Sequence, residues 1–132
     1  MSKLIKGTHH IALKYESVEV FEKSMHFFKD VLGLELVRTW GSGDELGAML
    51  STGNSLLEMF SFGSVSTETG SVNHFALATD DVDACIEAAK AEGLEILKEP
   101  KDIVIGSVPP FPARIGFCRG WGGEEIEFFC EK

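Results

Sequence analysis

The sequence is poor in the features that mark secreted, membrane-spanning and nucleic-acid-binding proteins. It has only three cysteines, without CxxC spacing, so we expect reduced thiols and no disulfide framework. The N-terminus lacks the apolar core of a signal peptide, and no apolar run is long enough to cross a bilayer. The sequence has 12 basic and 21 acidic residues, and the resulting net charge of −9 argues against nucleic acid and anionic membranes as partners. These absences predict a cytoplasmic protein that binds neither.

Proline is also scarce, with four residues in 132, and no low-complexity tract divides the chain. The polar segment Ser64–Ser71 has the composition of an exposed connection. A hydrophobic content of 44% is enough for a substantial core in a single domain of this length. We therefore expect one domain over residues 1–132, in which the polar segment joins two similar halves at about residues 8–63 and 72–131.

The two halves share a series of equivalent residues. Each opens with an expected strand in which a histidine and alanines alternate with bulky apolar residues, and a helical pattern follows. A candidate helix N-cap lies seven residues after each histidine, and a glycine closes each helical pattern. The matched pairs are His10 and His74, Ser17 and Asp81, and Gly33 and Gly93.

Three further strands are expected after each helix. They span about Glu35–Trp40, Ala48–Thr52 and Ser55–Phe62 in the first half, and Glu95–Lys98, Arg114–Arg119 and Glu124–Glu131 in the second. The last strand of each half carries a glutamate, Glu58 or Glu127, at the equivalent place. The sequence thus predicts an α+β fold built from tandem βαβββ modules that form a curved mixed sheet.

The repeated histidines and glutamates are candidate metal ligands. Strand alternation places each histidine beside small alanines, on the face opposite the bulky residues. Each glutamate has a phenylalanine on its own face, where a carboxylate is costly to bury unless it is paired or bound to a cation. Two imidazoles and two carboxylates suit Zn²⁺, Ni²⁺, Co²⁺ or Mn²⁺. We predict a metal cleft with one divalent ion per site, held by His10, Glu58, His74 and Glu127.

On these residues the chain resembles the vicinal-oxygen-chelate superfamily, which includes glyoxalase I, methylmalonyl-CoA epimerase, extradiol dioxygenases and fosfomycin or bleomycin resistance proteins. The resemblance covers essentially the whole chain, from His9-His10-Ile11-Ala12-Leu13 to Glu125-Ile126-Glu127-Phe128. The first-strand ligand positions of the family fall on His10 and His74, and its fourth-strand positions on Glu58 and Glu127. A ligand set of this composition is most similar to that of bacterial glyoxalase I.

The resemblance implies an enzyme that converts the hemithioacetal of an α-keto aldehyde into a 2-hydroxyacyl thioester, as lactoylglutathione lyase does. A Lewis-acidic metal chelated by two neighbouring substrate oxygens would stabilise a metal-bound enediolate. Glu58 and Glu127 are both candidates for the catalytic base, and we favour Glu127. Two alternatives stay open: an enzyme similar to methylmalonyl-CoA epimerase, and a non-catalytic member that binds a small molecule.

Several positions depart from glyoxalase I and leave the thiol cosubstrate open. Lys14 stands where glyoxalases usually have arginine, Phe62 replaces an asparagine, and Gly120–Gly123 replaces an Asp-Pro-Asp-Gly-like turn. Lys14 and Arg114 are candidates for binding an anionic end of the small-molecule substrate.

Three further expectations concern the surroundings of the cleft and the assembly. Trp40 and Trp121 are candidates for lining the substrate pocket, with rim packing as the alternative. The proline-containing segment Asp102–Pro112 is expected to form a loop over the cleft that could act as a lid, with plain surface packing as the alternative. The resemblance to small glyoxalases implies a homodimer.

Overall fold

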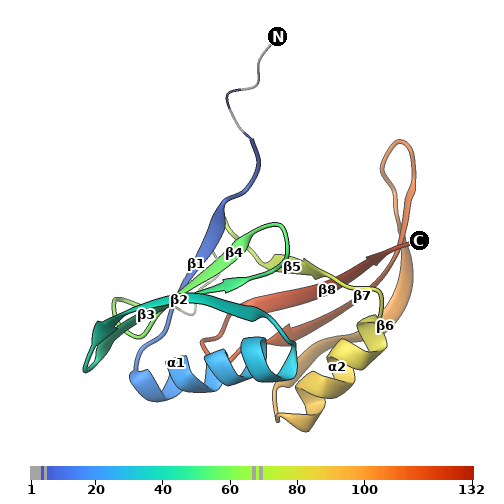
Figure 1. The fold of residues 1–132 in the computed structure, drawn as a ribbon. Coiled ribbons are helices and arrows are strands. Elements are labelled where there is room, and N and C mark those ends of the chain that lie inside the picture. Colours follow the sequence, from blue (N-terminus) through green and yellow to red (C-terminus); the bar gives the residue numbers. More distant parts are fainter. Residues whose placement is uncertain (1–3, 5, 67, 69) are drawn as a thin grey trace. The chain divides into compact units, whose positions relative to one another are not determined.

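The chain forms two compact units, Met1–Val65 and Ser66–Lys132. In the computed structural model the described residues are 4, 6–66, 68 and 70–132. Each unit contains one four-stranded mixed sheet and its helix (Figure 1). The predicted α+β architecture of tandem βαβββ modules is confirmed.

The first unit follows the order strand, helix, three strands. Its elements are β1 (His10–Lys14), α1 (Val18–Met25), the π-helical turn η1 (His26–Val31), β2 (Glu35–Ser42), β3 (Glu45–Ser51) and β4 (Leu56–Phe60). The strand order is β1-β4-β3-β2, with β1 parallel to β4 and the other pairs antiparallel.

The second unit repeats this topology. Its elements are β5 (Phe75–Ala78), α2 (Val82–Ala91), β6 (Glu95–Ile105), β7 (Phe111–Arg119) and β8 (Glu125–Glu131). The strand order is β5-β8-β7-β6, and again only the pair formed by the first and last strands is parallel.

The helix boundaries agree with the predicted caps. The backbone N–H of Val20 donates to Ser17 Oγ at 3.3 Å, and that of Ala84 donates to Asp81 Oδ1 at 2.9 Å. Each cap thus satisfies an N–H group that has no partner inside its helix. Gly33 and Gly93 follow the helices with φ of 84° and 87°, a left-handed conformation that favours glycine.

Large side chains fill the core of each unit. In the first unit the consecutive residues Phe27 and Phe28 of the π-helical turn are both buried. In the second unit α2 lies so close to β7 that a Cβ added at Gly116 would be 2.8 Å from Ile86 Cγ1. A small residue at this position therefore sets how closely α2 approaches the sheet.

The predicted bounds of the loop Asp102–Pro112 are wrong, because the loop is shorter. β6 continues to Ile105 and β7 begins at Phe111, so residues 106–110 alone connect the two strands of a long hairpin. The run Ile103–Ile105 consists of β-branched residues, which favour strand geometry and outweigh the nearby prolines. Pro112 is the second residue of β7, and its carbonyl accepts a hydrogen bond from the Lys132 N–H at 3.1 Å.

The helices are short. Within the described part of the chain, none has the length and apolar character needed to span a membrane.

Candidate functional site

The first unit places His10 and Glu58 on one face of its sheet. β1 and β4 are neighbours, with Ala12 directly opposite Glu58. His10 projects from the same face of β1 as Ala12, and its Nε2 lies 3.4 Å from Glu58 Oε1. The two side chains are 38% and 17% exposed, so the imidazole is open to an incoming ligand while the carboxylate is shielded.

The second unit repeats the pair. Ala76 is opposite Glu127, and His74 Nε2 lies 3.1 Å from Glu127 Oε1. The His74 and Glu127 side chains are 35% and 11% exposed. We call the sheet face that carries such a pair the histidine face of its unit.

The residue before each histidine contacts its other ring nitrogen. Asn73 Oδ1 lies 2.7 Å from His74 Nδ1, and His9 Nδ1 lies 2.8 Å from His10 Nδ1. An amide oxygen only accepts, so the contact with Asn73 orients the ring with Nδ1 towards Asn73 and Nε2 towards Glu127. His74 Nε2 and Glu127 Oε1, 3.1 Å apart, share either a proton or a metal cation. The donor set therefore fits a divalent ion.

A row of equivalent residues crosses each histidine face. In the first unit the row runs across the four strands as Arg38, Met49, Glu58 and Ala12, and in the second as Lys98, Phe117, Glu127 and Ala76. Each row thus joins a basic residue on the outer strand to the ligand pair.

The basic ends of these rows are site candidates that the sequence analysis missed. The signal was present, because Glu35-Leu36-Val37-Arg38 and Glu95-Ile96-Leu97-Lys98 open equivalent strands with the same pattern. In the second unit Lys98 Nζ lies 5.3 Å from the centre of the Phe117 ring, which in turn packs edge-on against His74 at 5.2 Å. A cation, an aromatic ring and an imidazole therefore adjoin one another beside Glu127.

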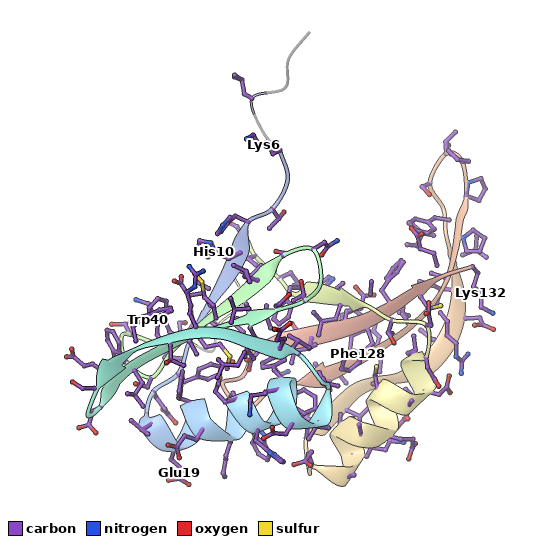
Figure 2. The ribbon with its side chains drawn as sticks, viewed as in Figure 1. Lys6, His10, Glu19, Trp40, Phe128 and Lys132 are labelled. Carbon is purple, nitrogen blue, oxygen red and sulfur yellow. The ribbon has the colours of Figure 1, made fainter. Side chains whose placement is uncertain are left out.

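Aromatic rings gather on the histidine face of the first unit. Trp40 and Phe60 meet edge-to-face with ring centres 5.9 Å apart, and Phe60 meets Phe62 in the same way at 5.9 Å. Figure 2 shows the side chains of His10 and Trp40 on the side of the sheet away from α1.

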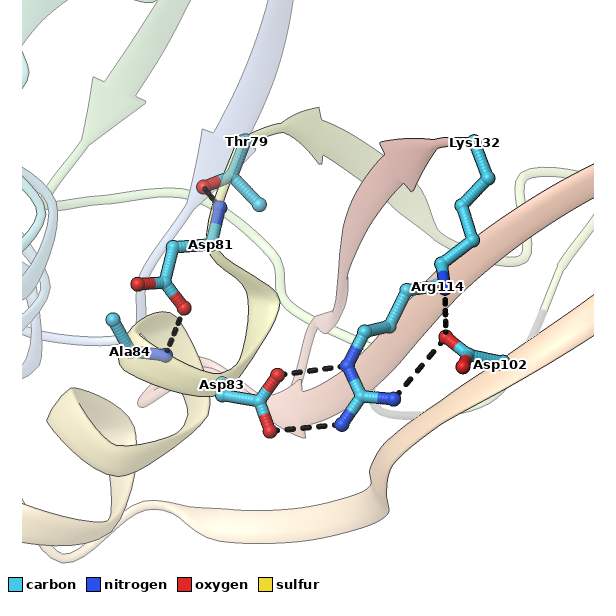
Figure 3. A network of polar contacts seen from close by, with 7 residues as sticks. All are labelled: Thr79, Asp81, Asp83, Ala84, Asp102, Arg114 and Lys132. Carbon is cyan, nitrogen blue, oxygen red and sulfur yellow. Dashed lines mark hydrogen bonds and ion pairs between the residues drawn. The ribbon is translucent and has the colours of Figure 1, made fainter.

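The two candidate anion-binding residues lie on different faces of their sheets. Lys14 shares the histidine face with His10, and it forms no ion pair with any described residue. Arg114 projects from the opposite face of β7, where its guanidinium donates to both carboxylate oxygens of Asp83 at 2.7 and 2.9 Å. It also contacts Asp102 at 3.2 Å, so its hydrogen-bonding groups are engaged away from Glu127 (Figure 3).

The cysteines are free thiols. Burial raises the pKa of Cys118 to about 12, with smaller contributions from Glu124 and Cys85. A thiol that stays protonated is a poor nucleophile and a poor metal ligand.

Each unit supplies one His–Glu pair. Among the residues that the structure describes, no group of three or more His, Cys, Asp or Glu side chains is placed to hold a metal ion.

The sequence profile of the Glyoxalase/Bleomycin resistance protein/Dioxygenase superfamily matches residues 7–128. This match spans most of the chain, including both strand–helix repeats and both His–Glu pairs, and the chain belongs to this superfamily. No curated protein matches the chain significantly.

Solved structures share the fold at low sequence identity. The fosfomycin resistance protein FosX from Listeria monocytogenes, complexed with Mn(II) and sulfate, is 17% identical with a TM-score of 0.73, over 98% of this chain and 95% of that one. A glyoxalase family protein from Enterococcus faecalis is 19% identical with a TM-score of 0.70, over 96% and 99%. A glyoxalase/bleomycin resistance protein/dioxygenase from Alicyclobacillus acidocaldarius is 15% identical with a TM-score of 0.68, over 96% and 92%.

Proposed function

We propose that this protein is a divalent-metal-dependent enzyme that isomerises the hemithioacetal of an α-keto aldehyde to a 2-hydroxyacyl thioester. The observation that carries the proposal is the repeated His–Glu pair, found at the same place in two sheets of one chain. A shielded carboxylate that contacts an imidazole is repeated at the equivalent place of both units, which a shared role of the two pairs would require.

The proposed ligands are His10 and Glu58 from one unit and His74 and Glu127 from the other. This set matches the preference of borderline divalent ions such as Ni²⁺, Zn²⁺, Co²⁺ and Mn²⁺ for imidazole and carboxylate. FosX, which shares the fold, was crystallised with Mn(II), in keeping with a divalent ion in this superfamily.

The glutamates of this set are the proposed proton carriers. A bound divalent ion would supply Lewis acidity to two adjacent oxygens of the substrate. Glu127 then takes the proton from the carbon that carries sulfur and returns it to the neighbouring carbon, so that the reaction is a balanced isomerisation. Glu127 is favoured over Glu58 because its side chain is the less exposed, 11% against 17%, which limits exchange of the proton with water.

The test of the metal proposal is uptake by the purified protein. After stripping with a chelator, equilibrium dialysis against Ni²⁺, Zn²⁺, Co²⁺ and Mn²⁺ in turn should give one bound ion per chain. Replacing any of the four ligands by alanine should cut uptake sharply while circular dichroism stays unchanged. His26→Ala is the matched control, because His26 is an exposed helix histidine.

The test of the reaction is a screen of hemithioacetals made from methylglyoxal and several thiols. Isomerisation should depend on the added metal and appear as thioester absorbance. Metal uptake without turnover of any adduct would contradict the isomerase proposal, and turnover of a 2-methylmalonyl thioester instead would replace it with an epimerase.

A further inference from the structure

The aromatic cluster of the first unit consists of Trp40, Phe60 and Phe62, and it is more exposed than a packing role requires. Trp40 and Phe62 are 37% and 39% exposed, and both rings contact Phe60 edge-on. The planes of Trp40 and Phe60 meet at 69°, so the two rings form a corner. Such corners accept a further flat ring in stacked or edge-to-face geometry.

Gly47 is the residue that allows this corner to form. It lies on β3 between Trp40 of β2 and Phe60 of β4 in the cross-strand register. A Cβ at this position would collide with the indole of Trp40. The bare backbone therefore lets the indole lie across β3 and reach Phe60.

The corner lies beside the proposed reaction centre and beside the cationic side chain of Arg38. Arg38 precedes Trp40 by two residues on the same strand, so both project from the histidine face, and its row leads through Met49 to Glu58. Arg38 forms no ion pair with any described residue, although acidic residues outnumber basic ones by 21 to 12 in the chain. A cation left without an acidic partner in such a chain is available to an anionic ligand.

We propose that the ligand of this face is a small anionic molecule with an aryl group, which stacks in the corner of Trp40 and Phe60 while Arg38 binds its negative charge. The proposal rests on the proposed function for the position of the reacting oxygens, next to His10 and Glu58. It names the substrate class for that site: compounds with vicinal oxygens that carry an aryl substituent and a negative charge.

The test compares the binding of mandelate, lactate and 1-phenylethane-1,2-diol. All three have vicinal oxygens; lactate replaces the phenyl group of mandelate by methyl, and the diol lacks its charge. Titration calorimetry on the metal-loaded and the metal-stripped protein should show that mandelate binds at least about tenfold tighter than lactate, because a buried phenyl group contributes that much. Mandelate should also bind about tenfold tighter than the diol, the scale of one charge-assisted contact.

In a Trp121→Phe background Trp40 is the only tryptophan, and binding of mandelate should quench its fluorescence.

Three variants made in this background test which residues cause the two affinity preferences. Trp40→Ala should abolish the preference for mandelate over lactate, and Gly47→Ala should reduce it by displacing the indole while every aromatic ring is kept. In the metal-stripped protein, where no ion binds the carboxylate, Arg38→Met should abolish the preference for mandelate over the diol and keep the preference over lactate. Lys29→Met, on the helix, should change neither preference.

Equal affinity for mandelate and lactate in the metal-loaded protein would overturn the proposal and leave the metal and isomerase proposals intact. A preference for mandelate that persists in protein that takes up no metal would support the aryl proposal and contradict the metal proposal. If Trp40→Ala instead dissociates a dimer in light scattering, the corner is an interface between copies, and the ligand proposal is wrong.

Discussion

Two buried serines of the first unit differ in their hydrogen bonds. Ser24 of α1 is 2% exposed, and its hydroxyl has no partner among the described residues. Ser61 is 3% exposed, but its hydroxyl accepts from the Leu46 N–H at 2.8 Å and donates to the Asp44 carbonyl at 2.7 Å. The first hydroxyl carries a desolvation cost without compensation, and the second joins the ends of β3 and β4.

The same substitution should therefore have opposite effects at these two sites. Ser24→Ala should raise the free energy of unfolding by about 1 kcal/mol, since it removes an unsatisfied group and favours the helix. Ser61→Ala should lower it by about 1 to 3 kcal/mol, because it leaves a buried N–H and a carbonyl without their partner. Urea denaturation measures both, and destabilisation of both variants would show that Ser24 has a partner in solution.

Glu127 should be distinguishable from a glutamate of the same strand. Glu127→Gln should reduce kcat for the best hemithioacetal by at least about a hundredfold, the usual scale for a lost general base. Glu131→Gln is the matched control, because Glu131 is exposed at the end of β8 and should leave kcat unchanged. Full activity of Glu127→Gln would transfer the role of base to Glu58.

At the scale of elements, a charged network joins α2, β6, β7 and the C-terminus. Hydrogen bonding from the Arg114 guanidinium lowers the pKa of Asp83, and hydrogen bonds from Lys132 and then Arg114 lower the pKa of Asp102. A carboxyl whose pKa is lower in the folded than in the unfolded state binds fewer protons when folded. Its stabilisation is therefore present above the unfolded pKa of about 3.9 and is lost as the pH falls through the folded value.

Arg114→Met should remove part of this pH dependence. The wild type should be the more stable protein at about pH 6, and the difference should shrink towards about pH 3 as Asp83 and Asp102 become protonated. Urea denaturation of both proteins across this range gives the two curves. High salt should reduce the difference at neutral pH, because the network is exposed and screened. A difference that does not change with pH would assign the effect of Arg114 to packing alone.

The helices and strands of this fold could be predicted because their signals are local. Ser17 and Asp81 act as caps, and Gly33 and Gly93 end the helices, through contacts that span only a few residues. The long hairpin of β6 and β7 could not be predicted in the same way. Its strands depend on pairing between residues such as Val104 and Pro112, and the prolines between them indicated a loop.

The His–Glu pairs could be predicted from repetition, but the basic residues of the rows could not be predicted from strand alternation. Leu36 pairs with Leu50, which is fully buried, and simple alternation would place Arg38 on that same buried face. A β-bulge between them shifts the register and turns Arg38 towards Met49 and the histidine face. Lys98 reaches its face through an equivalent bulge after Ile96.

At the scale of the whole molecule, each unit supplies one His–Glu pair. The proposed ligand set needs both the pair of the first unit, His10 and Glu58, and the pair of the second unit, His74 and Glu127. The two pairs can come from one chain or from two chains of a symmetric dimer. We expect a homodimer in light scattering, because twofold dimers are the commonest soluble assembly and such a dimer would create two complete sites at once.

Mixing two inactive variants tests whether the sites are shared between chains. If they are, a heterodimer of His10→Ala and His74→Ala has one site with both defects and one intact site, so we expect metal binding and turnover to return after subunit exchange. The matched control is a mixture of His10→Ala with Glu58→Ala, in which both changes fall on the same unit. Every site then keeps one defect, and no rescue should follow. A dimer that exchanges subunits without rescue in the first mixture would place each complete site within a single chain, and a monomer in light scattering would exclude sharing altogether.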